Sequence, residues 1–174
     1  FRINTYGCQI QFRNLFLVGP QAGGNTIDFE GKLDDEAIQQ NNSLPLGGFR
    51  IQDCKFAKGV TAIRITGVNT GATGHQNWNV LIERCHFRGM AQAIRIDDDG
   101  GTEYNSIFRG NIRHIVVQGV GNGGTSPAVE VDIANLKGDW RDWLIEDSGP
   151  TGAGGYAVKI RTARSEGFTW DNVD

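Results

Sequence analysis

The chain has 174 residues, 39% of them hydrophobic and 21% charged, which fits one folded domain spanning residues 1–174 and excludes a disordered chain. Its formal net charge of -3 gives no bulk attraction to nucleic acid or anionic lipid, and no apolar run approaches the roughly 18 residues of a membrane span. The 25 glycines against 4 prolines predict many tight turns between short extended segments.

The main signal is a repeat in the middle of the chain. Residues 49–56 (FRIQDCKF) reappear as residues 80–87 (VLIERCHF), and residues 62–65 (AIRI) reappear as residues 93–96 (AIRI). Both blocks are displaced by the same 31 positions (80 − 49 and 93 − 62). Self-similarity at a fixed period is typical of a solenoid, in which each repeat stacks on the next.

Weaker copies of both blocks extend the repeat toward the two ends of the chain. The first block recurs at residues 12–17, 112–117, 145–148 and 170–173, and the second at residues 26–29, 128–131 and 157–160. Apolar residues alternate with polar ones in each copy, as in a strand with one buried face. We therefore predict an all-β, single-stranded parallel β-helix of about six coils. A loop insertion at residues 30–48 separates the first two coils, and strand-like sequence at both ends indicates a fragment of a longer chain.

Each coil is expected to bend at a two-residue corner, because two positions rather than one separate its inward residues. Asn and Asp tolerate the left-handed backbone that a sharp corner requires. The second corner position holds Asn14, Asp53, Arg84, His114, Asp147 and Asn172. Stacked coils lie about 4.8 Å apart, so equivalent residues form columns in the core. The predicted core columns are Phe12, Ile51, Ile82, Ile112, Ile145 and Trp170, and Leu15, Cys54, Cys85, Ile115 and Ser148.

The cysteines give a separate prediction. Three cysteines are an odd number, which argues against a complete disulfide framework. Cys54 and Cys85 are core neighbours, either as a disulfide or redox pair or as two buried thiols that pack as small apolar groups, and we favour the second. Cys8 has no assigned partner.

The pattern Ile-x-Asp-Cys-x-Phe at residues 51–56, followed by Ala-Ile-x-Ile at residues 62–65, resembles the right-handed β-helix of the pectate lyase superfamily and of phage tailspikes. The resemblance covers nearly the whole chain and implies that the strand carrying residues 62–65 and 93–96 lines a saccharide-binding cleft. The Asp-Asp-Cys and Gly-His-Gly motifs of polygalacturonases are absent from the sequence. The pattern therefore indicates an architecture and leaves the activity open.

The outward positions of this strand are predicted to form a charged column. Arg64 and Arg95 are neighbours in it, which is unfavourable unless a carboxylate, solvent or an anionic ligand lies between them. An acidic sugar could be that ligand, whereas the simpler interpretation is a solvated ladder of charges. The column consists of Asp28, Arg64, Arg95, Glu130 and Lys159.

Carboxylates gather at the end of the same strand. Asp97, Asp98 and Asp99 are consecutive, and Glu130 and Asp132 face outward on the next coil. Paired carboxylates can act as acid and base on a glycosidic bond, and three together can hold calcium, but an acidic turn at the strand end is the simpler interpretation and the one we favour. These five residues are the catalytic candidates, and no obligate cofactor is predicted.

Aromatic residues in or beside the loops are candidates for stacking against sugar rings, with packing against a neighbouring coil as the alternative. These residues are Trp78, Trp140, Trp143 and Tyr156. Together with Arg64, Arg95 and Lys159, three of them (Trp78, Trp143 and Tyr156) form the predicted substrate-binding set. The three histidines have no metal-ligand spacing.

Three functions remain open. The first is a homotrimeric, phage tailspike-like receptor-binding protein of the virion tail that recognises, and in one version depolymerises, a bacterial surface polysaccharide. The second is a secreted pectate-lyase-like polysaccharide lyase or hydrolase, and the third is a non-catalytic β-helical adhesin or structural spike. The first accounts best for the odd cysteines and the variable outer loops. It places the protein on the virion or outside the cell, with a polysaccharide and copies of itself as partners.

Overall fold

A computed structural model describes residues 2–5, 10–19, 24–31, 49–67, 75–98, 106–122, 124–151, 155–165 and 167–174 of the chain. In these ranges every regular element is a β-strand, and no helix is long and apolar enough to cross a membrane. The insertion at residues 30–48 lies almost entirely outside the described residues, and so does Cys8. The strands are β1 (Arg2–Thr5), β2 (Ile10–Arg13), β3 (Phe16–Val18), β4 (Asn25–Gly31), β5 (Phe49–Gln52), β6 (Lys55–Ala57), β7 (Thr61–Gly67), β8 (His75–Arg88), β9 (Gln92–Asp98), β10 (Ser106–Gln118), β11 (Val129–Glu146), β12 (Val158–Arg164) and β13 (Phe168–Val173).

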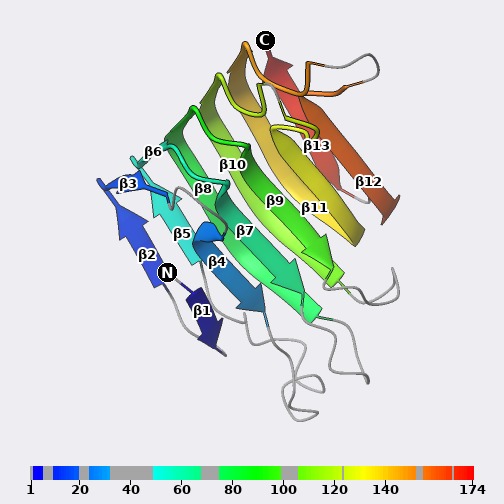
Figure 1. The fold of residues 1–174 in the computed structure, drawn as a ribbon. Coiled ribbons are helices and arrows are strands. Elements are labelled where there is room, and N and C mark those ends of the chain that lie inside the picture. Colours follow the sequence, from blue (N-terminus) through cyan, green and yellow to red (C-terminus); the bar gives the residue numbers. More distant parts are fainter. Residues whose placement is uncertain are drawn as a thin grey trace, which may run out of the picture.

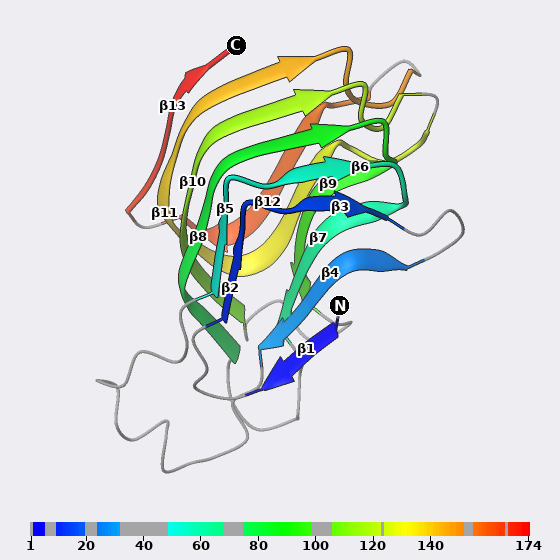
Figure 2. The same ribbon diagram turned by 90° about the vertical axis from the view of Figure 1, so that its left-hand side faces the viewer.

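The strands form three parallel ladders that wind around one core (Figures 1 and 2). Face I consists of β2, β5, β8, β10, β11 and β13, which pair in that order. Face II consists of β3, β6 and the C-terminal parts of β8, β10 and β11. Face III consists of β1, β4, β7, β9, the first residues of β11, and β12. The predicted all-β parallel solenoid is therefore confirmed.

The core is built from columns of apolar residues, one from each pass of the chain. On face III, Ile27, Ile63, Ile94 and Val129 are in register and fully buried. On face II, the rings of Phe56 and Phe87 stack with their centroids 4.9 Å apart. Stacking of this kind removes apolar area from water in every coil. Each Å² of buried apolar area stabilises the folded state by about 25 cal/mol.

The corners confirm the predicted left-handed positions. Asn14, Asp53, Arg84, His114, Asp147 and Asn172 all have a positive φ, between 46° and 56°. The chain turns again at a second corner, between faces II and III, after each of β6, β8, β10 and β11. The residue at this second corner also has a left-handed backbone. These residues are Lys58, Gly89, Gly119 and Asp147.

Asp147 thus belongs to the second corner, and Asp142, with a φ of 57°, occupies the first. This corrects the predicted register of the coil that contains β11. Trp140 pairs with Ile112, and Trp143 pairs with Ile115, at the core positions predicted for Ile145 and Ser148. Ile145 pairs instead with Val117.

The error has a physical reason. β11 passes from face III into face I as one uninterrupted strand, so the coil from Ile112 to Trp140 spans only 28 positions (140 − 112) and has no loop between these two faces. The prediction assumed a loop in every coil and therefore placed Trp140 and Trp143 outside the core. Both are buried, and their rings stack with centroids 5.5 Å apart.

Candidate functional site

The outer surface of face III carries two columns of polar residues in register. Ile63, Ile65 and Ile96 are buried in the core, so the residues that alternate with them along each strand point outward. The first column contains Arg64, Arg95, Glu130 and Lys159, and the second contains Asp97, Asp132 and Arg161. The predicted outward column is confirmed from Arg64 to Lys159, and the side chain of Asp28 lies outside the described residues.

Asp97 resolves the unfavourable contact between the two neighbouring arginines. Arg64 donates from Nε to Oδ1 at 3.2 Å and from a terminal nitrogen to Oδ2 at 3.3 Å. Arg95 Nε lies 2.7 Å from Oδ2 of the same carboxylate. The Asp97 side chain is only 7% exposed, so two guanidinium groups neutralise a carboxylate that its neighbours cover.

The other two carboxylates are also paired with cations. Glu130 accepts hydrogen bonds from Lys159 Nζ at 3.2 Å and from Nε2 of the buried Gln92 at 3.3 Å. Asp132 accepts a hydrogen bond from Arg161 Nε at 2.8 Å, and a terminal nitrogen of Arg161 approaches its second oxygen. Face III is therefore a ladder of ion pairs whose cations keep large exposed fractions: 44% for Arg95, 49% for Lys159 and 63% for Arg161.

The structure brings together only part of the predicted catalytic set. Asp97 and Asp132 are register partners on adjacent strands, as an inter-coil carboxylate pair requires. Glu130 and Asp132 flank the buried Val131 and share its outward side. The side chain of Asp98 and all of Asp99 lie outside the described residues. Among the residues described, no three His, Cys, Asp or Glu side chains form a metal-ligand group, so calcium at Asp97 to Asp99 stays a prediction.

The predicted aromatic platforms separate into different environments. Tyr156 is 66% exposed and available to a ligand. Trp143 is 1% exposed, stacks on Trp140 and donates from Nε1 to the Ile112 carbonyl oxygen at 2.9 Å. For Trp143 the alternative of packing in the core is therefore confirmed, because a ring that is 1% exposed offers no face to a sugar. The side chain of Trp78 lies outside the described residues.

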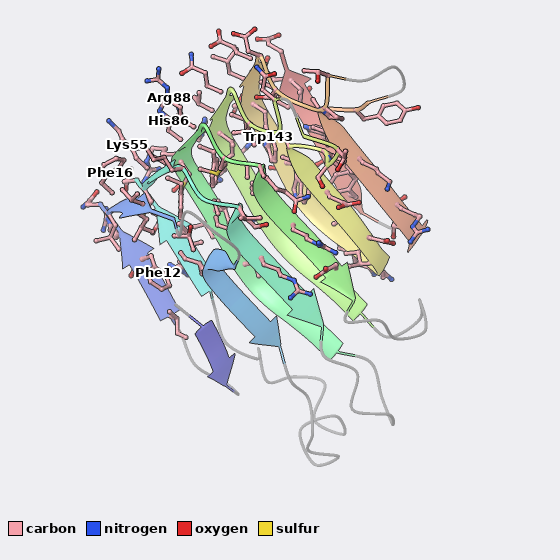
Figure 3. All side chains as sticks on the ribbon, viewed as in Figure 1. Phe12, Phe16, Lys55, His86, Arg88 and Trp143 are labelled. Carbon is pink, nitrogen blue, oxygen red and sulfur yellow. The ribbon has the colours of Figure 1, made fainter. Side chains whose placement is uncertain are left out.

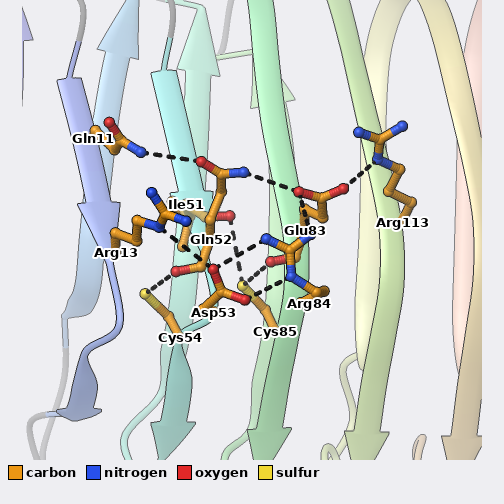
Figure 4. Close-up of polar contacts among 10 residues, drawn as sticks. All are labelled: Gln11, Arg13, Ile51, Gln52, Asp53, Cys54, Glu83, Arg84, Cys85 and Arg113. Atoms are coloured by element: carbon orange, nitrogen blue, oxygen red, sulfur yellow. Dashed lines mark hydrogen bonds and ion pairs between the residues drawn. The ribbon is translucent and has the colours of Figure 1, made fainter.

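A charged network on face I was not predicted from the sequence (Figure 4). Glu83 lies at its centre, with a side chain 8% exposed and Oε1 2.7 Å from Arg113 Nε. Its Oε2 lies 2.7 Å from an Arg84 terminal nitrogen and accepts a hydrogen bond from Gln52 at 2.9 Å. Burial raises the pKa of Glu83, but the Gln52 hydrogen bond and the two arginines outweigh it, so the net pKa is lowered. The signal available in the sequence was Gln52 and Glu83 at equivalent positions of the 31-residue repeat.

The corner beside this network carries a second ion pair. Arg84 donates from Nε to Asp53 Oδ1 at 2.6 Å, and Arg13 lies 3.6 Å from the other oxygen. The hydrogen bond from Arg84 lowers the pKa of Asp53. These contacts link three successive coils at the corner, and they explain how Arg84 is held in a left-handed conformation that Asn or Asp adopts more readily.

The two described cysteines are buried free thiols, which confirms the favoured interpretation. Burial raises the pKa of Cys54, and it raises that of Cys85 to about 12. Since a thiolate is the reactive form, neither thiol is suited to redox or nucleophilic chemistry at neutral pH.

Fold and site together define a parallel β-solenoid with one internally neutralised polar face. Comparisons of this chain with protein-family models, with curated proteins and with solved structures found no match.

Proposed function

We propose that this chain is the glycan-recognition part of a phage tailspike-like receptor-binding protein, and that face III binds a bacterial surface polysaccharide. The observation that supports this most directly is the two-column ladder of donors and acceptors from Arg64 to Arg161, carried by adjacent strands. The strands repeat about every 4.8 Å, so the surface offers a regular series of hydrogen-bonding groups to an extended polymer. Rigid strands also hold these groups in place before binding, which lowers the entropic cost of recognition.

The exposed cations supply the contacts and the carboxylates orient them. Arg95, Lys159 and Arg161 are each held from one side by Asp97, Glu130 or Asp132 and exposed on the other. Their outward N–H groups are donors for sugar hydroxyl or carboxylate oxygens. Tyr156, in the segment before β12, adds an exposed ring against which a sugar can stack.

Binding is tested with purified capsular polysaccharides and lipopolysaccharide O-chains from a panel of bacterial strains, scored by affinity electrophoresis and calorimetry. The test variants are Arg95→Gln and Lys159→Gln. The matched control is Arg141→Gln, because Arg141 is 45% exposed and pairs with Asp139 two residues away, on face I. We expect one polysaccharide to bind and both test variants to weaken it, with the control unchanged. Equal weakening by the control, or no binding across the panel, contradicts the proposal.

Cleavage of the bound polysaccharide is a second part of the proposal, with Glu130 and Asp132 as the acid and base. The test measures new reducing ends, which a hydrolase produces, and absorbance of unsaturated uronate, which a lyase produces. Loss of product in Glu130→Gln, with the variant still folded and still binding, supports catalysis. Binding without any product, unchanged in Glu130→Gln and Asp132→Asn, favours the non-catalytic adhesin.

The assembly state separates the spike from the secreted enzyme. The spike proposal includes a homotrimer, which native mass spectrometry or sedimentation of the longest expressible chain detects directly. A trimer supports it. A monomer that cleaves polysaccharide would instead favour a secreted lyase or hydrolase.

A further inference from the structure

Face II differs from face III in that its cations have no acidic partners among the described residues. Lys55 and His86 are register partners in one outward column, and Arg88 lies two residues beyond His86 on the same strand. Lys58 follows β6 at the second corner. Figure 3 shows Lys55, His86 and Arg88 projecting from one side of the ribbon, with Phe16 beside them. We call these five residues, with Val18, the basic strip.

Within the described part of the chain, no salt bridge joins Lys55, Lys58 or Arg88 to a carboxylate. The acidic groups nearest in sequence and register are already engaged: Asp53 by Arg84 and Arg13, and Glu146 by a hydrogen bond from Gln118. His86 reports the resulting positive field, because burial lowers its pKa and the charges of Lys55 and Arg88 lower it further. Like charges held together on one surface without counter-charges favour an anionic partner.

Exposed apolar groups border these cations. Phe16 pairs in register with Lys55 and is 68% exposed, and Val18 pairs with Ala57 and is 60% exposed. The strip therefore combines a flat apolar ring with cations about one strand spacing away, roughly 4.8 Å. A sugar ring with a carboxylate matches both features, because its C–H face packs on an aromatic ring while the carboxylate meets Arg or Lys.

We propose that the basic strip binds an acidic polysaccharide, with Lys55 and Arg88 pairing with sugar carboxylates and Phe16 packing against a ring. The choice of a saccharide rests on the proposed function, whereas the choice of surface rests on face II alone. Single-stranded nucleic acid also uses cations and aromatic rings, but the net charge of -3 on the whole chain opposes its long-range attraction. The two faces then differ in what they bind: carboxylates at face II, where the cations lack described acidic partners, and hydroxyl as well as carboxylate oxygens at face III.

The probes are an oligogalacturonate, which carries a carboxylate on every sugar, and an uncharged dextran oligosaccharide of equal length. We expect the chain to bind the oligogalacturonate and not the dextran, and Arg88→Gln to weaken binding about tenfold, as loss of one charged hydrogen bond does. Arg50→Gln is the matched control, because Arg50 is exposed on face I and the same charge is removed there. We expect its affinity to equal that of the unchanged chain.

His86 supplies a local readout that does not depend on the variants. An anion bound on the strip should raise the lowered pKa of His86, which NMR titration of its ring protons follows with and without oligogalacturonate. Dextran should leave the pKa of His86 unchanged. The inference would be overturned if oligogalacturonate did not bind, or if Arg50→Gln weakened its binding as much as Arg88→Gln does. It would also be overturned if a single-stranded oligonucleotide bound more tightly, or if the chain formed a dimer that Arg88→Gln abolishes.

The two proposals fail in distinguishable ways. If Lys159→Gln abolishes glycan binding while Arg88→Gln and the pKa of His86 show no effect, the basic strip is excluded and face III stands. If Arg88→Gln alone abolishes binding, the site on face III is excluded and the basic strip stands.

Discussion

Faces II and III share one core but treat charge in opposite ways. On face III, Arg64, Arg95, Lys159 and Arg161 are all paired with carboxylates of neighbouring strands. On face II, Lys55 and Arg88 have no such partners among the described residues. Because the inward residues alone fix the register of a stacked coil, outward residues are free to differ from face to face. The difference therefore does not follow from the packing of the coils, and it is what the two proposed binding surfaces rest on.

The largest expected effect comes from breaking the core on which both faces depend. Trp140→Ala removes a fully buried ring that contacts Trp143, Phe168 and Trp170, and we expect it to lower the free energy of unfolding by about 3–5 kcal/mol. Chemical denaturation measures the loss, and glycan binding at both faces should fall together. Tyr156→Ala, at a residue 66% exposed, is the control and should change stability by no more than about 0.5 kcal/mol. Similar losses in the two variants would contradict the described packing.

The next largest effect is expected where the backbones of two neighbouring coils lie in close contact. Gly138 has a φ of 135°, and a Cβ there would lie 1.9 Å from the carbonyl oxygen of Gly110 on the neighbouring coil. Gly138→Ala should therefore destabilise the chain by more than about 1 kcal/mol, since neither backbone can move without breaking the ladder. Gly119→Ala is the matched control, because Gly119 has a φ of 59° and an added Cβ meets nothing within 4 Å. Equal thermal shifts would mean that the two coils are not in close contact.

Face I offers an intermediate case, in which paired charges contribute to stability. Glu83→Gln should lower the free energy of unfolding at pH 7 by about 1–3 kcal/mol, because Arg84 and Arg113 lose their common carboxylate. The net pKa of Glu83 is lowered on folding, so its contribution is present above the unfolded value near 4.5 and is lost as pH falls through the folded pKa.

Denaturation of both proteins at pH 7 and at pH 3 checks this prediction. The difference in free energy of unfolding between the unchanged chain and Glu83→Gln should shrink at pH 3. At that pH Glu83 is protonated in the unfolded state, so its lowered pKa in the folded state contributes less to stability. A difference that is the same at both pH values would show that packing rather than charge is responsible.

The sequence predicted what periodicity controls and missed what depends on coil length. Core residues such as Ile51, Ile82 and Ile112 were found because a buried column tolerates only apolar side chains, and the corners because few residues adopt a positive φ. Trp143 was misplaced because a strand that continues without a loop shortens its coil, and composition carries no signal for that. The W-R-D-W segment at residues 140–143 did match the corner pattern I-Q-D-C of residues 51–54, and comparing them would have located the turn.

The partners of the site residues were beyond sequence reasoning for a different reason. The predicted column correctly placed Arg64 beside Arg95, but the carboxylate between them belongs to the neighbouring outward column, at Asp97. Which of several nearby acids a long arginine contacts depends on rotamers, and a repeat pattern does not specify these. The same limit applied to Glu83, whose partners come from three strands of face I.

The smallest expected effect tests the comparison of the two faces directly. Arg95→Gln loses an ion pair with Asp97, but Arg95 is 44% exposed and Arg64 remains, so we expect a loss of only about 0.2–1 kcal/mol that shrinks as salt is added. Arg88→Gln loses no ion pair with a described residue and removes one of the two charges that act on His86, so stability should stay within about 0.5 kcal/mol or rise. Denaturation of both variants at low and high salt gives the two values. A clear, salt-sensitive loss in Arg88→Gln would mean that a carboxylate meets Arg88, and the difference between the two faces on which the proposed binding at face II rests would be gone.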